Sequence, residues 1–592
     1  MRSCCELMRC RNLIGILWLW VWLPLGLLSC GEGTSVQLDP DARLLRDDLV
    51  DSTTGSLSSA LSARASRHDR MRSNSLLYRN ALTQKMLVDV ALLQSIGTGD
   101  EEVFLTLDPP NRSLVGTATI HLNAPSQDLP SVTFSLSAKS IDSVKVNGSD
   151  ETSSSSYVND ILTITPPSPL AAGTPLTVEI AWSDADVNRT VDFSPEGGSN
   201  FIGALLDENS TFFVMNYQFW PWLVGQSIMN NLTFQVTYPA DQTLVMSGAK
   251  TESVVAGDGQ SKTDTWNITF PFQGNMGLAL ANYETATGQC GNTVIEIYAI
   301  PGKSIDNYPI RPVTYGPVLS SYCDQYLTWF GEPAFGTIRF VGVDERFTSG
   351  VATPGLVIVP NYTWDDDGSG SFPKRDFYLA HELAHQWWGN DVFVGSAADL
   401  WLQEGMADFV AGDAVDTIRG HTDGQGIWLW EVEPLLSYYQ GGGQDYPLVP
   451  ADTSTMVPQI YYIKGAWVLR MLESVIGNET LMNSIQQFRE AHHFTAATTD
   501  EFKNLITLTS GQDLDWFFSE WLYGLGLLSL SEKHSEKAGS VNVTITQSKP
   551  WAQDPDRYFV MPIPVRIKNN GRSTDEVLQL TGIESTASFS PP

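Results

Sequence analysis

The sequence predicts a multidomain protein of the α+β class. Its 592 residues are too many for one hydrophobic core, so several domains are expected. Between residues 100 and 288, short apolar runs alternate with polar residues at period two, which is typical of antiparallel strands. From residue 289 strand-like and helix-like segments are mixed, and after about residue 420 the pattern is largely helical.

The first 30 residues predict an export signal. A basic start is followed by an apolar run from Leu13 to Leu28, which is shorter than the roughly 20 residues that a membrane-spanning helix needs. The run ends in LLSCG, which resembles a bacterial lipobox in which Cys30 is lipidated. Cleavage after Gly31 is the alternative. We therefore expect an exported protein, either a cell-envelope lipoprotein of the periplasm or cell surface, with Cys30 as its membrane anchor, or a secreted protein.

Residues 31–99 are predicted to form a polar tether with one amphipathic helix, Leu76–Ile96. An N-terminal β domain is predicted at 100–288 and a mixed domain at 289–532. Residues 540–592 indicate two or three further strands, fewer than the about seven of a complete β-sandwich.

The net charge limits which binding partners are expected, and the cysteine content bears on the cellular compartment. The formal net charge of −32 would repel nucleic acid and anionic lipid, so neither is an expected partner. Outside the predicted signal and Cys30, only Cys290 and Cys323 remain, and either a disulfide or two buried thiols would fit them. If the protein is eukaryotic and secreted, sequons at these positions could carry glycans: Asn111, Asn147, Asn188, Asn209, Asn231, Asn267, Asn361, Asn478 and Asn542.

The strongest chemical signal is HELAH, at residues 381–385 within a helical pattern. His381 and His385 are four residues apart, so both imidazoles lie on one helix face and can reach one metal ion. A catalytic zinc site needs a third protein ligand and one open position for water. Eighteen residues separate His385 from Glu404, which lies in a second predicted helix and can supply that ligand. Two imidazoles and a carboxylate favour zinc over calcium or copper, with one ion per chain.

The remaining acidic residues of the two helices suggest roles around that ion. Glu382 is offset from His381 by about 100° around the helix, which places its carboxylate beside the metal as a general base for a bound water. Asp408 follows Glu404 by one helical turn and is either a hydrogen-bond acceptor for a ligand histidine or an ordinary surface residue.

These motifs resemble the aminopeptidase N family of gluzincin peptidases. HELAHQWWGN, then DLWLQEG, then IYYIKGA at residues 460–466 are similar to three family segments. The resemblance covers roughly residues 100–530. It implies a saddle-like β domain, a thermolysin-like catalytic domain with a helical tail and the start of a C-terminal β-sandwich. It also implies that Tyr462 hydrogen-bonds the tetrahedral oxyanion, a role suited to a preorganised phenol.

One departure from the family concerns the strand before the zinc helix. The family usually has a glutamate there that binds the substrate's free α-amine. The matching stretch here begins Ser349, Gly350, Val351, with Ala352 in the place of that glutamate. The strand can still pair with an extended peptide through its backbone. Gln218, in MNYQFWPW, is carried over from the family as a further contact with the substrate terminus.

The sequence therefore predicts a zinc peptidase acting on peptides, removing N-terminal residues. Two alternatives stay open. One is an endopeptidase, or another amide hydrolase, that needs no free amine. The other is a zinc-holding scaffold that binds peptides without turnover; it would need neither Glu382 nor Tyr462.

Overall fold

The structure of the chain is a computed structural model. It describes residues 35–37, 98–123, 128–191, 201–214, 217–224, 231–274, 276–302, 304, 307–366, 373–453, 456–526, 528–537, 539–547, 558–569 and 572–590. The predicted signal with Cys30, and the predicted helix Leu76–Ile96, lie outside these residues. Within the described part of the chain, no helix is long and apolar enough to cross a membrane.

The chain divides into two compact units, and neither is continuous in sequence. The first comprises the described parts of Ala63–Ile427 and Met482–Phe502. The second comprises those of Met1–Ser62, Trp428–Leu481 and Lys503–Pro592. This division rests on contacts within each unit, and the domain boundaries predicted from the sequence stay predictions.

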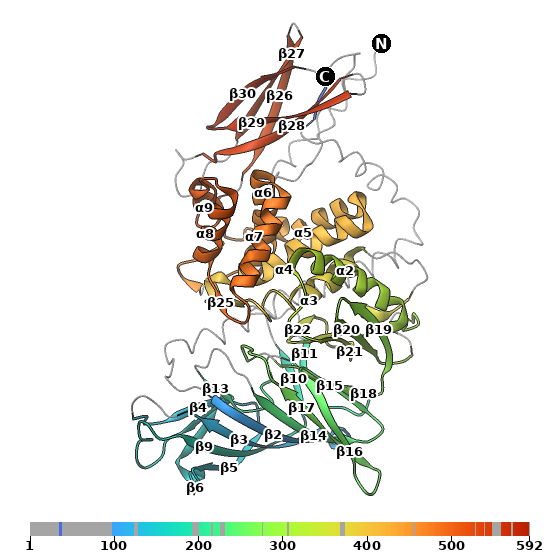
Figure 1. Ribbon diagram of the computed structural model, residues 1–592, viewed down its shortest axis with the longest axis vertical. Coiled ribbons are helices and arrows are strands. Elements are labelled where there is room, and N and C mark those ends of the chain that lie inside the picture. The colour runs from blue at the N-terminus through green and yellow to red at the C-terminus, as the bar shows by residue number, and fades with distance from the viewer. Residues whose placement is uncertain are drawn as a thin grey trace. The chain divides into compact units, whose positions relative to one another are not determined.

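The first unit begins with an eight-stranded sheet (Figure 1). Every neighbouring pair in it is antiparallel except β14 with β2, which is parallel. From edge to edge the strands are β16 (Ala249–Val255), β17 (Ser261–Ile268), β14 (Leu232–Pro239), β2 (Thr98–Asp108), β3 (Ser113–Leu122), β9 (Leu176–Ala185), β5 (Ser140–Val146) and β6 (Ser149–Asp150). The predicted antiparallel β region is therefore confirmed.

Alternating burial explains why these segments form strands. In β3 and β9 nearly every second side chain is buried while those between are exposed or partly exposed, because successive side chains point to opposite faces. The buried face of this sheet and two smaller sheets contribute to one apolar core. The first smaller sheet consists of β13 (Trp222–Leu223), β4 (Val132–Ser135), β8 (Ile161–Ile164) and β7 (Ser155–Val158). The second consists of β10 (Asn188–Val191), β11 (Phe201–Leu205), β12 (Thr211–Phe213), β18 (Leu278–Ala281) and β15 (Thr243–Met246).

A five-stranded mixed sheet follows in the same unit and leads to the candidate site. Its order is β19 (Glu284–Cys290), β20 (Thr293–Ala299), β21 (Thr337–Val343), β23 (Leu356–Pro360) and β22 (Val351–Thr353). The strands β20, β21 and β23 run parallel, and β22 is an antiparallel edge strand. The helices that follow in the chain are α2 (Tyr315–Phe330), α3 (Pro373–Ala384) and α4 (Trp401–Arg419). The predicted mixture of helix and strand is confirmed.

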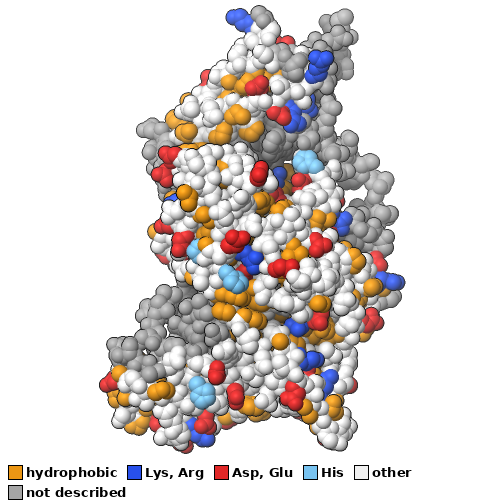
Figure 2. Space-filling view, in the orientation of Figure 1, with side chains coloured by type: hydrophobic (Ala, Val, Ile, Leu, Met, Phe, Trp, Pro, Cys, Tyr) orange, Lys and Arg blue, Asp and Glu red, His pale blue; other side chains and the backbone are white. Residues whose placement is uncertain are grey.

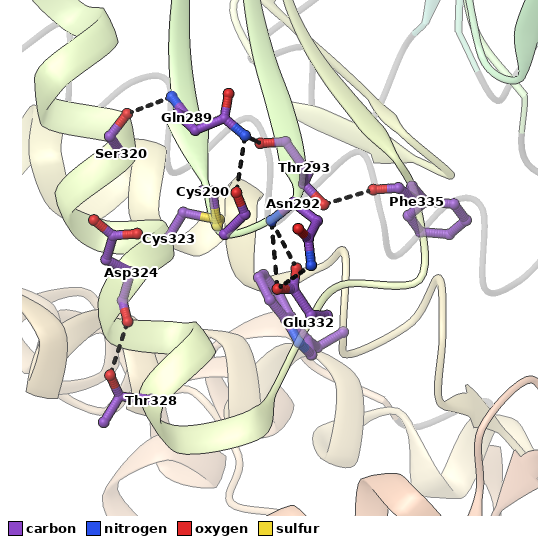
Figure 3. The surroundings of a disulfide bond; sticks show 12 residues. Gln289, Cys290, Asn292, Thr293, Ser320, Cys323, Asp324, Thr328, Glu332 and Phe335 are labelled. Atoms are coloured by element: carbon purple, nitrogen blue, oxygen red, sulfur yellow. Dashed lines mark hydrogen bonds between the residues drawn. A yellow bond between two sulfur atoms is a disulfide. The ribbon is translucent and has the colours of Figure 1, made fainter.

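A disulfide joins this sheet to α2 (Figure 3). Cys290 ends β19, Cys323 lies in α2, and their Cα atoms are 5.6 Å apart. The close approach depends on glycine, since a Cβ on Gly316 of α2 would lie only 2.6 Å from the Thr287 carbonyl oxygen. The backbone N–H of Gln289 also donates to Ser320 Oγ at 2.9 Å. The pairing that the sequence left open is thus present.

The second unit contains helices and a small β region. Its helical part includes the end of α5 (His421–Gln440), then η9 (Ile460–Lys464), α6 (Gly465–Ile476), most of α8 (Thr499–Ser510) and α9 (Asp515–Trp521). Two three-stranded sheets follow: β1 (Ser35–Gln37), β28 (Met561–Asn569) and β29 (Arg572–Leu580), and β26 (Leu530–Lys537), β27 (Ser540–Gln547) and β30 (Glu584–Phe589). The described residues between 540 and 592 therefore form more strands than the two or three expected there. The side chains of β26 are exposed or only partly buried, so its sequence carries no apolar alternation.

Acidic side chains are spread over the surface rather than gathered in one patch on the face shown in Figure 2.

Replacing Cys290 and Cys323 together by Ala should lower the free energy of unfolding of the first unit. The two cysteines are 33 residues apart, and closing such a loop corresponds to roughly 3–4 kcal/mol in the chain-entropy model. Guanidinium unfolding of the variant and the oxidised wild type checks this, with thiol titration confirming that the wild type carries the disulfide. An unchanged midpoint would show that the packing of α2 holds without the bond.

Candidate metal centre and active site

The helices α3 and α4 lie antiparallel and place the candidate metal ligands together. Arg419, in the last turn of α4, contacts the carboxylate of Asp376, in the first turn of α3, at 2.5 Å. The Tyr322 hydroxyl of α2 donates to the same carboxylate at 3.1 Å. Burial raises the pKa of Asp376 above its usual value, while the bonds from Arg419 and Tyr322 act in the opposite direction. This ion pair fixes the helix ends opposite those that carry the ligands.

The three predicted ligand residues converge at the other end of this helix pair. Nε2 of His381 and Nε2 of His385 are 3.1 Å apart. Oε2 of Glu404 lies 3.3 Å from Nε2 of His385 and 3.8 Å from Nε2 of His381. All three side chains are buried. His381 and Glu404 lie on α3 and α4, whereas His385 follows the last residue of α3.

This triangle fits a zinc ion. Ligands bound tetrahedrally at about 2.0–2.1 Å are themselves about 3.4 Å apart, which matches the three separations. The donor set of two imidazoles and one carboxylate is that of a catalytic site with an open position. Within the described residues, these are also the one group of acidic, histidine or cysteine side chains close enough to hold a metal ion.

Each histidine has an oxygen atom close to its second ring nitrogen. Nδ1 of His385 lies 2.9 Å from the carbonyl oxygen of Trp388. A carbonyl oxygen only accepts, so Nδ1 carries the proton and Nε2 presents its lone pair to the metal position. Nδ1 of His381 lies 2.7 Å from Oδ1 of Asp408, the residue expected one turn after Glu404. The role of the Trp388 carbonyl could not be read from the sequence, because a backbone acceptor leaves no side-chain signal.

Glu382 lies against a glycine. A Cβ built on Gly350 would be 2.2 Å from Oε1 of Glu382 and 2.5 Å from the Tyr378 hydroxyl oxygen. Position 350 therefore has room for glycine alone unless both side chains move. Tyr378 precedes Glu382 by one helical turn, so the two side chains share a face of α3. Tyr378 was not among the predicted site residues, although its spacing of four residues from Glu382 is visible in the sequence.

The edge strand β22 runs beside this point. Gln386 connects it to the end of the zinc helix, since its side chain donates to the Thr353 carbonyl at 3.3 Å and accepts from the Gly355 N–H at 2.8 Å. Alternate residues of a strand point to opposite faces, so Ala352 points to the face opposite that of Val351 and Thr353. Val351 and Thr353 are fully buried, whereas Ala352 keeps 7% exposure.

The two other predicted site residues lie in separate elements. Tyr462 is buried in η9, a single π-helical turn that opens α6 in the second unit. Such turns occur frequently at functional sites. Gln218 lies in the β-rich part of the first unit, where its side-chain amide donates to the Trp220 carbonyl at 3.2 Å.

Replacing Asp408 by Ala should weaken zinc binding by about 10- to 100-fold, because His381 loses the acceptor that fixes its tautomer. Replacing His385 by Ala should leave less than one zinc per chain. Asp416→Ala is the matched control, since Asp416 lies on the same helix but pairs with the exposed His421. Chelator competition measures all three, and wild-type affinity in Asp408→Ala would contradict the assigned contact.

Comparisons with known proteins agree with this geometry. Residues 340–521 match the peptidase family M1 domain. The chain is 25% identical to a probable aminopeptidase 2 of Sulfurisphaera tokodaii over 208 residues, which cover 34% of this chain and 26% of the relative. It is 29% identical to the glutamyl aminopeptidase of Sus scrofa over 282 residues, which cover 43% of this chain and 28% of the relative. The chain thus matches just over a quarter of the length of these relatives.

A solved structure shows the fold over a larger part of the chain. The M1 zinc metallopeptidase of Deinococcus radiodurans, in a mutant form bound to Tyr-Ser-Ala, superimposes with a TM-score of 0.57. It is 19% identical, and the match covers 72% of this chain and 94% of that one. Residues 340–521 contain both ligand-bearing helices and β22, so the sequence match and the metal geometry concern the same part of the chain. Residues 340–521, which hold the candidate metal centre, are thus similar to the peptidase family M1 domain, and the described fold resembles that of an M1 zinc metallopeptidase.

Proposed function

We propose that the protein hydrolyses peptide bonds near the N-terminus of peptide substrates, with Glu382 as general base. The observation that carries this proposal is that Glu382, which follows the candidate ligand His381 on α3, lies against Gly350, the residue just before the edge strand β22. Zinc held by His381, His385 and Glu404 would polarise the scissile carbonyl and lower the pKa of a bound water.

Glu382 and Tyr462 have complementary proposed roles. Glu382 accepts the proton of the attacking water and delivers it to the leaving amine. The phenol of Tyr462 donates a hydrogen bond to the oxyanion that develops on the carbonyl. Support for Glu382 comes from its contact with Gly350, and support for Tyr462 comes from its motif and its π-helical turn. Asp408 keeps His381 in the metal-binding tautomer.

The strand β22 is the proposed substrate-binding edge. Its partner on one side is β23, and it ends the sheet among the described strands, so an extended peptide can pair with it. Gly350, Val351 and Ala352 would contact the substrate there, and Gln218 is the proposed contact for its terminus. Ala352 offers no anion to a free α-amine. This favours a second candidate, an endopeptidase or amide hydrolase that does not require the amine.

The proposed location is outside the cytoplasm, anchored through Cys30 or secreted. The disulfide between Cys290 and Cys323 supports it, because such bonds persist in oxidising compartments.

Glu382→Gln should retain zinc and lower kcat for a peptide substrate by about 10²–10⁴-fold, the usual contribution of a positioned general base. The amide cannot accept the proton, whereas the metal ligands are unchanged. Zinc content and turnover are measured on the same preparation. Turnover near that of the wild type, with zinc bound, would mean that another group is the base.

Ala352→Glu tests how the substrate terminus is recognised. The new carboxylate would lie on the strand proposed to bind the substrate, so it should raise kcat/KM for a free-amine peptide by about tenfold to a hundredfold, the value of one charge-assisted hydrogen bond. The N-acetylated copy of that peptide is the control and should gain nothing. Equal gains on both would place residue 352 away from the amine. A wild type that prefers the acetylated copy would favour the endopeptidase alternative.

A further inference from the structure

The loop after the second metal ligand is a tight turn. The Asn390 N–H donates to the His385 carbonyl at 3.1 Å, and the Val392 N–H donates to the Trp387 carbonyl at 2.9 Å. Gly389 has a φ of +107°, and a Cβ there would lie 2.7 Å from the Gln403 side chain of α4. This turn contains the Trp388 carbonyl, which accepts from Nδ1 of His385. Whatever fixes the turn therefore fixes the orientation of that imidazole.

A buried carboxylate in this turn is held by two basic side chains. Asp391 is fully buried. Its Oδ2 accepts from Nε of Arg489 at 2.7 Å, and its Oδ1 lies 2.5 Å from Nδ1 of His493. The Asp391 carbonyl accepts from the Phe494 N–H at 2.8 Å. Both the side chain and the backbone of Asp391 are thus bound by the segment around residues 489–494.

Arg489 uses its remaining donors on a third segment. It lies on α7 (Asn478–Ala491), and its two terminal nitrogens donate to the carbonyls of Phe330 and Glu332, each at 2.7 Å. These residues are at the end of α2, where the Gly331 carbonyl also accepts from Nε1 of Trp387 at 3.1 Å. One guanidinium therefore joins the ligand turn, the end of α2 and α7.

The segment that carries Arg489 is distant in sequence but belongs to the unit with the metal site. Met482–Phe502 packs with Ala63–Ile427, although the residues on either side of it belong to the second unit. Part of this segment lies beside the ligand turn, since β25 (Ala496–Ala497) pairs in parallel with β24 (Phe393–Val394) just after that turn. Phe494 adopts a φ of +52°, a region unfavourable for a bulky residue unless its surroundings fix it.

We propose that Arg489 and Asp391 are positioning residues for the metal ligand His385. They act through the backbone of the turn, by keeping the Trp388 carbonyl in place as the acceptor for Nδ1. A planar guanidinium suits this role, because its fork of donors can bind a carboxylate and two carbonyls at once. This inference rests on the metal site of the proposed function.

Arg489→Gln should weaken zinc binding by about 10- to 100-fold, the loss usual when the partner of a ligand histidine is disturbed. It should also change the visible absorption spectrum of the protein loaded with Co²⁺, which reports ligand geometry. Arg489→Lys keeps the charge but cannot reach all three acceptors, so its effect should lie between wild type and Arg489→Gln. Asp391→Asn keeps the shape of the turn and serves if Arg489→Gln fails to fold.

The matched control is Arg189→Gln, which breaks an ion pair with the buried carboxylate of Asp184 in the β-rich part of the same unit. It should lower the melting temperature without changing zinc affinity or the Co²⁺ spectrum. The measurements use the full chain, with chelator competition for affinity. Zinc affinity and spectrum equal to wild type in Arg489→Lys and Asp391→Asn would overturn the inference, whatever their melting temperatures. Failure of the wild type to bind zinc at His385 would overturn it together with the proposed function.

Discussion

The structure depends on a concentration of acidic groups that a metal cation must balance. Glu382, Glu404 and Asp408 bring three carboxyl groups into the same buried region as the imidazoles of His381 and His385. Burying so much negative charge is costly unless it is paired, and a divalent ion is the natural counter-charge. The antiparallel packing of the two ligand helices, with an ion pair at their far ends, supplies the rigidity that this arrangement needs. The free energy of metal binding is thereby part of the free energy that holds the helices together.

The sequence predicted the features that follow from local spacing. Two histidines four residues apart on a helix lie on the same face, so His381 and His385 could be predicted as a pair of metal ligands without any tertiary information. The same spacing put Asp408 one turn after Glu404, but it left open whether Asp408 accepts a hydrogen bond from a histidine or lies at the surface. The strand periodicity likewise predicted the antiparallel β region, since its core face is regularly apolar.

The features that were missed come from contacts between distant segments or from the backbone. The acceptor for His385 is the backbone carbonyl of Trp388. Every residue type has such a carbonyl, so the sequence gives no sign of it. Gly350 was assigned to substrate binding, but its contact with Glu382 depends on how the strand meets the helix. The distance between Cys290 and Cys323 along the chain left their pairing open, and only the close packing of a helix on a strand decided it.

The interleaved course of the chain sets the order in which the catalytic unit can be completed during synthesis. When a growing chain has emerged as far as the end of α4 at Arg419, all three metal ligands are present. Arg489 is still missing, and so is the rest of Met482–Phe502, which belongs to the same unit. The intervening residues 428–481 must emerge first, and they belong to the other unit. The ligand turn therefore lacks the contacts of Arg489 until the whole of the intervening segment 428–481 has been made.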